Sequence, residues 1–303
     1  MVRTVYANRA GPAGPSPEKR RGKRAAFQGG GDVHELGMTS WRANALEGRA
    51  VDREPLRGGA KGTRLETQKT ARLFGWLFIA TFITAIGARL FFVNGLGATW
   101  QDMRFIPGAG SETSMYLGAI LEFGVIVTNI ATAVVLYPIV RRQSEGVALG
   151  YVTARIMESA FILVGLMSII SVVTVANALA GATGAEAASL VTQGNSLVST
   201  YEWAFLFGPG LVVGFGNGLM LGYLMYRSGL VPRPMAMLGL IGGPMLILSF
   251  GLILFGVYEN GSGPAFLLAL PEIAWEASLG IYAAWKGFRP SPILREASAA
   301  TGR

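Results

Sequence analysis

Apolar residues along the chain gather in six long runs instead of alternating with polar ones. Each run is long enough to cross a hydrocarbon layer, which takes roughly 20 helical residues. We favour helices over strands because the runs are continuous, and because lipid obliges each backbone to satisfy its own hydrogen bonds. The predicted spans cover about residues 73–93, 115–137, 148–175, 199–225, 235–257 and 265–285. The predicted fold class is therefore all-α, a polytopic transmembrane bundle of six helices.

Residues 1–68 differ from the rest, because they are rich in Gly, Pro and Arg and show no apolar periodicity. Such a segment cannot bury a core, so we predict a disordered basic tail, either solvated or an extension from a misassigned start codon. Alternatively, its basic cluster at 19–24 contacts anionic lipid headgroups. The predicted domains are this tail, a transmembrane domain at 69–290 and a short cytoplasmic tail at 291–303.

Basic residues in the connections predict the direction of threading. Connections rich in arginine and lysine alternate with connections that hold only Arg104 or no basic residue. The basic ones hold Arg141, Arg142, Arg227 and Arg233, followed by Lys286 and Arg289 after the last span. Because such residues stay on the cytoplasmic side, we predict a multi-pass protein of the cell membrane with both termini in the cytoplasm.

Composition supports a lipid environment and argues against nucleic acid as a partner. Charged residues make up 15% of the chain, against about a quarter in soluble domains. The net charge of +8 lies entirely in residues 1–72, which hold 15 of the 26 Lys and Arg but only 7 of the 18 Asp and Glu. The apolar part is therefore charge-balanced, and the predicted partner is the bilayer. The oligomeric state stays open.

The segment 177–197 is almost uncharged and lies between two predicted spans. Its small residues fit either a short surface helix or a loose loop. Next to it, glycines recur every fourth residue at Gly210, Gly214, Gly218 and Gly222. Such a row predicts a ridge on which another helix packs closely.

Four stretches together resemble a known family. They are TARLFGWLFIATFITAI at 70–86, LYPIVRRQSEGVALGYVTARIMES at 136–159, YRSGLVPRPMAMLGLIGG at 226–243 and PEIAWEASLGIYAAWKGFRPSP at 271–292. In this order they resemble the multi-pass membrane proteins described as domain of unknown function 4386, over about residues 69–292. The resemblance implies an integral membrane protein and brings no established activity.

Charged side chains inside the spans are the candidate site. Arg155 and Glu158 lie about 60 degrees apart on one helix face, so they can meet. An unpaired charge at this depth costs at least about 2.5–3.5 kcal/mol on insertion scales, so a partner or a wet cavity is expected. From the threading, Glu276 falls at a similar depth, and we predict a mid-membrane group of these three residues.

The remaining charges are predicted to form an outer group, which consists of Arg89, Glu122, Glu202 and Glu272. Asn129 shares a face with Glu122 and extends this polar stripe inward. Glu272 and Glu276 are one turn apart, and like charges so placed repel unless a proton or a cation lies between them. The candidate polar site therefore comprises Arg155, Glu158, Glu276, Glu272, Glu122 and Asn129.

Missing residue types exclude several activities. The single histidine, His34, lies in the tail, and there is no cysteine. Haem ligation by two histidines, a serine–histidine dyad and a zinc–thiolate site are therefore excluded. No span holds an aspartate or a deep lysine, and no glycine-rich phosphate loop is present. We predict no cofactor and no metal, and no motif supports an enzyme.

Two functions remain open. The buried charges either form a site that binds or transports a small polar solute or a proton, or serve only as ion pairs of a structural or accessory bundle.

Overall fold

The long apolar segments of this chain form helices, because a helix satisfies the hydrogen bonds of its backbone N–H and C=O groups within the segment itself. The computed structural model describes residues 57–294, with side chains described from Leu65 onward. Within residues 57–294 the structure is helical and contains no strand. The helices are α2 (Arg57–Leu96), α3 (Glu112–Val140), α4 (Glu145–Leu179), α5 (Gly184–Phe205), α6 (Gly222–Ser228), α7 (Arg233–Leu254) and α8 (Gly263–Lys286).

Two π-helical segments join α5 to α6. They are η1 (Leu206–Val212) and η2 (Gly214–Leu221). Together with α5 and α6 they form one helical span, Gly184–Ser228, and within residues 57–294 six helical segments are long and apolar enough to cross a membrane. The predicted all-α class with six spans is confirmed.

Helix α2 begins earlier than the sequence predicts. Residues 57–68, predicted as tail, are helical in the structure, because extending an existing helix costs far less than starting one. Lys69 and Glu66 support this turn with an exposed ion pair of 3.0 Å. The chain divides into two units, Met1–Arg53 and Glu54–Arg303, and all described residues belong to the second. The predicted disorder of 1–56 and the cluster at 19–24 lie outside them.

The segment 177–197 is mostly helical. Helix α4 continues to Leu179, and α5 begins at Gly184, whose φ of +57° suits glycine in this tight connection. The segment is thus neither a loose loop nor a separate surface helix, but extends both neighbouring spans.

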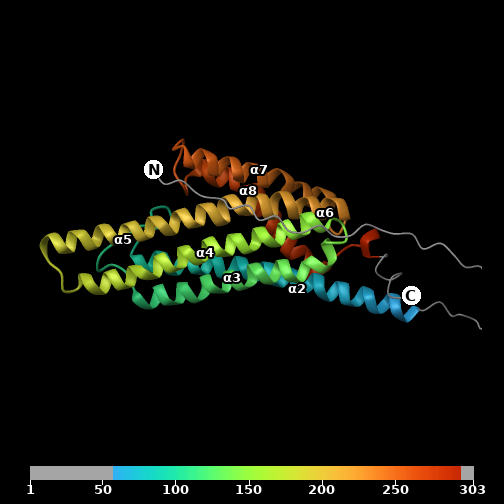
Figure 1. The fold of residues 1–303 in the computed structure, drawn as a ribbon, viewed down its shortest axis with the longest axis horizontal. Helices are drawn as coiled ribbons and strands as arrows, with labels where there is room; N and C mark the ends of the chain where they lie inside the picture. Colours follow the sequence, from blue (N-terminus) through green and yellow to red (C-terminus); the bar gives the residue numbers. More distant parts are fainter. Residues whose placement is uncertain (1–56, 295–303) are drawn as a thin grey trace, which may run out of the picture. The chain divides into compact units, whose positions relative to one another are not determined.

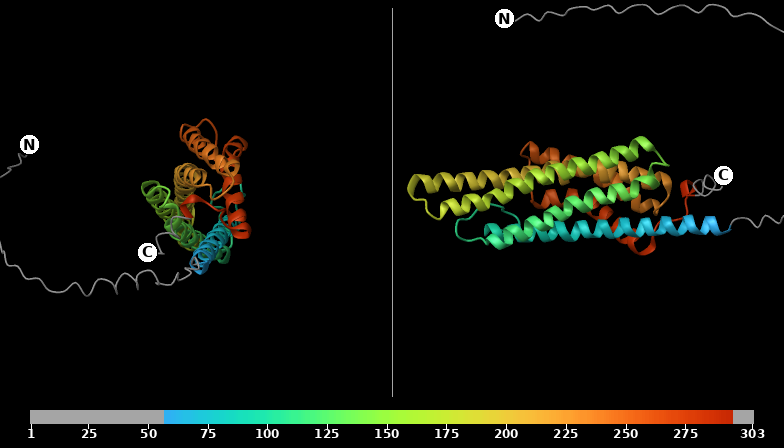
Figure 2. Two further views of the ribbon diagram at one scale, coloured as in Figure 1. Left: turned by 90° about the vertical axis from the view of Figure 1, so that its right-hand side faces the viewer. Right: turned by 60° about the horizontal axis from the view of Figure 1, so that its bottom comes forward.

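Neighbouring spans pack side by side and close into a ring. Helix α2 contacts α3, α3 contacts α4, and α4 contacts α5 and both π segments. Helix α7 packs on η2 and on α8, and α8 returns to α2, as the end-on view of Figure 2 shows. In Figure 1, α2 begins and α8 ends at the same end of the bundle. The side chains that face the centre of this ring form its core.

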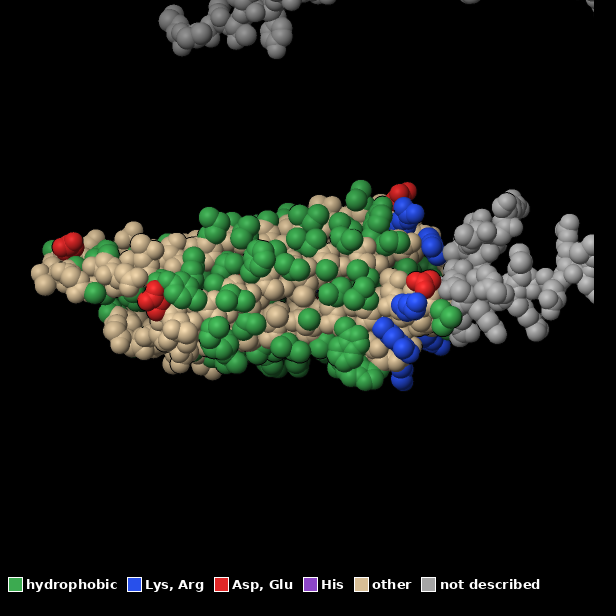
Figure 3. Space-filling view, turned by 90° about the horizontal axis from the view of Figure 1, so that it is seen from below, with side chains coloured by type: hydrophobic (Ala, Val, Ile, Leu, Met, Phe, Trp, Pro, Cys, Tyr) green, Lys and Arg blue, Asp and Glu red, His purple; other side chains and the backbone are tan. Residues whose placement is uncertain are grey.

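Charge separates the two ends of the bundle. Arginine and lysine side chains gather at one end, and the middle of the face in Figure 3 carries no charged side chain. We call this end the basic end. Helix α2 begins there, and the loop at 141–144 and the C-terminus of α8 lie there. The opposite end holds the connections 97–111, 180–183 and 255–262.

The glycine row predicted in the fourth span packs on α7. A Cβ on Gly218 would lie 2.3 Å from the Cα of Gly243, and one on Gly214 would lie 2.8 Å from the carbonyl oxygen of Gly243. Gly222 also faces α7, next to Leu240. Gly210 differs, because its nearest neighbours belong to its own span. Only the three later glycines therefore allow the close approach.

Residues after α8 return to the bundle instead of leaving it as a tail. Arg289 N–H donates to the carbonyl of Leu230 at 2.8 Å, and Ser291 Oγ donates to the carbonyl of Ser228 at 2.5 Å. Gln68 Nε2 donates to the carbonyl of Phe288 at 2.7 Å, and that phenylalanine is buried. The predicted tail at 291–303 is therefore packed as far as residue 294, and 295–303 lie outside the described residues.

Candidate functional site

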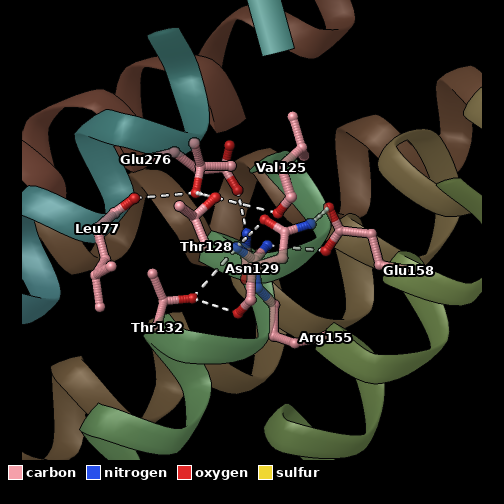
Figure 4. Close-up of polar contacts among 10 residues, drawn as sticks. Leu77, Val125, Thr128, Asn129, Thr132, Arg155, Glu158 and Glu276 are labelled. Carbon is pink, nitrogen blue, oxygen red and sulfur yellow. Dashed lines mark hydrogen bonds and ion pairs between the residues drawn. The ribbon is translucent and has the colours of Figure 1, made fainter. Parts of the chain in front are cut away.

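An arginine from α4 forms the centre of a buried polar cluster. Arg155 Nη1 lies 2.8 Å from Glu158 Oε2, so the predicted contact within α4 is present. Arg155 Nη2 donates to Asn129 Oδ1 of α3 at 2.6 Å, and Asn129 Nδ2 donates to Glu158 Oε1 at 2.9 Å. The three side chains thus form a closed ring of hydrogen bonds, drawn in Figure 4.

Further contacts complete this cluster. Thr132 Oγ1 accepts a long bond of 3.4 Å from Arg155 and donates to the carbonyl of Asn129 at 2.6 Å. The guanidinium also lies 5.5 Å from the centre of the Phe78 ring on α2, a distance suited to a cation–π contact. Arg155 and Glu158 are 2% and 5% exposed. Hydrogen bonds to the charged groups strengthen this buried pair, and Nε of Arg155 is its one buried donor without a partner among the described residues.

Glu276 reaches the same part of the interior from α8 (Figure 4). It accepts a hydrogen bond from Asn217 Nδ2 of η2, and the charge of Arg155 attracts it. The described ion pairs do not include Arg155 with Glu276, because Glu158 takes the guanidinium. Glu276 therefore adds a second carboxylate around one arginine.

The π-helical segment positions Asn217 for this contact. Trp275 Nε1, fully buried on α8, donates to the carbonyl of Asn217 at 2.9 Å. π-Helical turns are rare and often occur at functional sites. Here two of them follow each other across residues that include Pro209 and several glycines. The π-helical segment η2 thus presents both the carbonyl and the side chain of Asn217 to α8.

Glu272 lies one turn before Glu276 and has no polar partner. Its side chain is 2% exposed, and neither carboxylate oxygen forms a hydrogen bond with the described residues. A Cβ on Gly242 or Gly218 would lie 2.8 or 2.9 Å from Oε2, so missing side chains make the space that this carboxyl occupies. A buried polar group without a partner costs free energy, and it calls for an explanation.

Two cavities border these carboxyl groups. The inner cavity, of about 130 Å³, is lined by the Arg155 cluster, Glu122, Glu276 and residues of α2. The outer cavity, of about 360 Å³, lies between η1, α7 and α8 and is lined by Glu272 and Glu276. Phe205, Pro209, Val213 and Glu276 line both. Glu276 therefore stands at the boundary between the two.

Carboxylates outnumber guanidinium groups in the spans. The acids are Glu122, Glu158, Glu202, Glu272 and Glu276, and the bases are Arg89 and Arg155. Each arginine has one glutamate as its ion-pair partner. The other three acids have no basic partner among the described ion pairs, so bound protons or cations must balance them if the hydrocarbon is to hold them.

Three residues of the predicted outer group, Arg89, Glu122 and Glu202, lie close enough to interact electrostatically, whereas Glu272 lines a different cavity. Arg89 pairs with Glu202 across the bundle and donates to the carbonyl of Trp100 at 3.4 Å. Glu122 instead lines the inner cavity and forms no hydrogen bond with the described residues, and Glu272 lines the outer cavity. Position along a span does not tell which way each helix face turns.

Sequence reasoning missed four residues of the site. Asn217 and Thr132 were detectable as polar residues in apolar runs, but their partners depend on helix packing. Phe78 and Gly242 carry no such signal, because aromatic and glycine residues are common in membrane helices. Among the described residues, no group of three or more His, Cys, Asp or Glu is arranged to hold a metal ion.

Comparison with known proteins gives one match. A model of the family described as a domain of unknown function (DUF4386) matches residues 73–287, which confirms the resemblance seen in the sequence. No curated protein and no solved structure matches the chain. Since the description of the family assigns no activity, the function has to be inferred from the site.

Removal of one partner from the Arg155–Glu158 pair should destabilise the protein more than removal of both. Arg155→Met or Glu158→Met leaves an uncompensated buried charge, which costs about 3–5 kcal/mol, whereas the double variant removes both charges of the pair. Chemical unfolding in detergent measures the free energies of unfolding. The exposed pair Arg104–Asp102 is the control, and its removal should cost about 1 kcal/mol or less. Additive effects of the two single substitutions would contradict the pairing.

Proposed function

The chain belongs to the family described as a domain of unknown function (DUF4386), and we propose that this member is a multi-pass protein of the cell membrane that binds and transfers a small polar solute or a proton. The proposed site comprises the carboxyl groups of Glu272 and Glu276 together with the polar cluster around Arg155.

The absence of any partner for Glu272 carries this proposal. A bundle that used its buried charges only for cohesion would pair each of them, as it pairs Arg155 with Glu158. Glu272 lies instead at a cavity, nearly without exposure, with both oxygens free of hydrogen bonds. Such a carboxyl group is suited to take up a proton or a cationic group, because either one removes its uncompensated charge.

The position of Glu276 supports transfer as well as binding. It borders the outer cavity, where Glu272 lies, and the inner cavity, where Arg155, Glu158 and Glu122 lie. A proton or cation held at Glu276 thus has carboxyl groups on both sides. Arg155 makes residence on the inner side less favourable for a cation, so the site offers two unequal positions.

A second candidate function is a structural or accessory bundle. The closed ring of hydrogen bonds among Arg155, Glu158 and Asn129 favours it, because both oxygens of Glu158 are paired and this charge pair needs no ligand for balance. This reading accounts for the inner cluster and leaves Glu272 unexplained.

The orientation follows from the charges of the basic end. Arg141, Arg142, Arg227, Arg233 and Lys286 all lie at the end where α2 begins and α8 ends. Basic residues stay on the cytoplasmic side of a cell membrane, so we place this end and both termini in the cytoplasm.

A cysteine-free chain allows a direct test of this orientation. Gln143→Cys lies in the loop between α3 and α4, and Ala185→Cys lies in the first turn of α5. An impermeant maleimide should label Ala185→Cys in intact cells, and should label Gln143→Cys only after the cells are opened. The reverse pattern would overturn the orientation.

Substitution of the free carboxyl groups should abolish proton uptake without unfolding the protein. Glu272→Gln and Glu276→Gln keep the shape of the side chain and cannot exchange a proton, so uptake by reconstituted vesicles, followed with a pH-sensitive dye, should fall to the level of empty vesicles. Glu145→Gln, an exposed residue in the first turn of α4, is the control.

Two results would favour the structural bundle instead. One is unchanged uptake in both variants. The other is failure of every such variant to assemble, together with recovery of assembly when Arg155 and Glu158 are exchanged.

A further inference from the structure

We propose that the outer cavity binds an organic cation with an apolar body, whose positive group lies at Glu272 and Glu276. This inference rests on the proposed binding function and names the class of ligand. It follows from the lining of the cavity, from the unpaired carboxyl group and from the mouth of the cavity.

The lining combines apolar walls with negative charge. Phe205, Phe250 and Phe266 contribute aromatic rings, and the aliphatic side chains come from η1, α7 and α8. The only charged residues in the lining are Glu272 and Glu276, and no lysine or arginine of the described chain lines it. An anion would meet repulsion here, and a neutral solute would not compensate the charge of the carboxyl groups.

A bare metal ion fits the lining less well than an organic cation. Calcium takes six to eight oxygen ligands and magnesium an octahedron of six. Besides the two carboxyl groups, the side-chain oxygens of the lining are those of Ser249 and Asn260, and Ser249 Oγ already accepts a bond of 2.9 Å from Tyr258. An ammonium or phosphonium group needs few oxygens and gains from aromatic rings around it.

The cavity has a size suited to such a ligand. Its volume of about 360 Å³ lies within the range of about 300–1,000 Å³ that is typical of sites for small molecules. Hydrophobic contact with the aromatic walls would hold the body of the ligand, while the carboxyl groups select its charge. Gly218 and Gly242 leave the room that Oε2 of Glu272 occupies.

The mouth of the cavity does not repel a cation. Trp100, Asn260 and Gly261, from the connections opposite the basic end, line it. Arg89 lies nearby, 5.8 Å from the Trp100 ring, but Glu202 neutralises it in an ion pair. A cation entering from this end therefore meets no unpaired positive charge before it reaches Glu272.

Equilibrium binding of tetraphenylphosphonium to the full-length protein in detergent tests the proposal. We expect saturable binding by isothermal titration calorimetry, weakened about tenfold or more in Glu272→Gln and in Glu276→Gln, as for loss of one contact to a charged group. Glu145→Gln should bind as the unsubstituted protein does. Triphenylphosphine oxide, similar in its rings but neutral, should bind about tenfold more weakly or not at all.

A second variant keeps the test valid if the glutamine variants do not fold. Ala269→Phe places a ring in the outer cavity and retains both carboxyl groups, so it should lose tetraphenylphosphonium binding. Binding that is equal for the neutral compound, that survives Glu272→Gln or that survives Ala269→Phe would overturn the ligand class.

Failure of the ligand class is distinguishable from failure of the proposed function. If the protein shows proton uptake that depends on Glu272, or stabilisation by Na⁺ or K⁺ alone, but does not bind tetraphenylphosphonium, the organic cation is wrong and the proposed site stands. If neither proton uptake nor the binding of any of these cations depends on Glu272, the ligand class and the proposed function are both wrong.

Discussion

Hydrocarbon does not tolerate uncompensated charge, and the interior of this bundle is arranged around that constraint. One arginine, Arg155, is surrounded by Glu158 of its own helix α4, Asn129 of α3 and the ring of Phe78 of α2. Once these contacts exist, α2, α3 and α4 have a fixed register. The charge of Arg155 is compensated by its ion pair with Glu158. The carboxyl group of Glu272, by contrast, has no partner among the described residues and borders a cavity. The contrast separates the groups that hold the fold from the groups that remain available for a ligand.

Close packing of α7 on η2 makes this arrangement possible. Gly214, Gly218 and Gly243 remove the side chains that would keep these elements apart, and Gly242 leaves space for Glu272. The same π-helical region presents Asn217 to both Glu276 and Trp275. Since a π-helical turn is less stable than an α-helical one, its presence at the boundary of two cavities agrees with a functional role for this region. Packing and site are therefore built from the same residues.

The sequence predicted the spans and the Arg155–Glu158 contact, because both depend on local properties: apolar length and the spacing of residues on one helix. It could not predict how residues 288–294 pack on the basic end, since this depends on contacts between distant segments. It also did not predict the continuation of α2 before residue 69, because these residues show no apolar periodicity. The grouping by depth correctly joined Arg89, Glu122 and Glu202 but wrongly included Glu272. Glu122 and Glu272 lie in different cavities because rotation of each helix, set by its neighbours, decides which side a residue faces.

The central claim is that Glu272 is a free carboxyl group at a cavity, while Glu158 is held by Arg155. Dicyclohexylcarbodiimide, an apolar reagent for carboxyl groups in lipid, tests this claim most directly when modified residues are located by mass spectrometry of the protein in vesicles. The account predicts modification at Glu272 and none at Glu158. Modification of Glu158 as fast as Glu272, or an unmodified Glu272 while other carboxyl groups in the spans react, would contradict it.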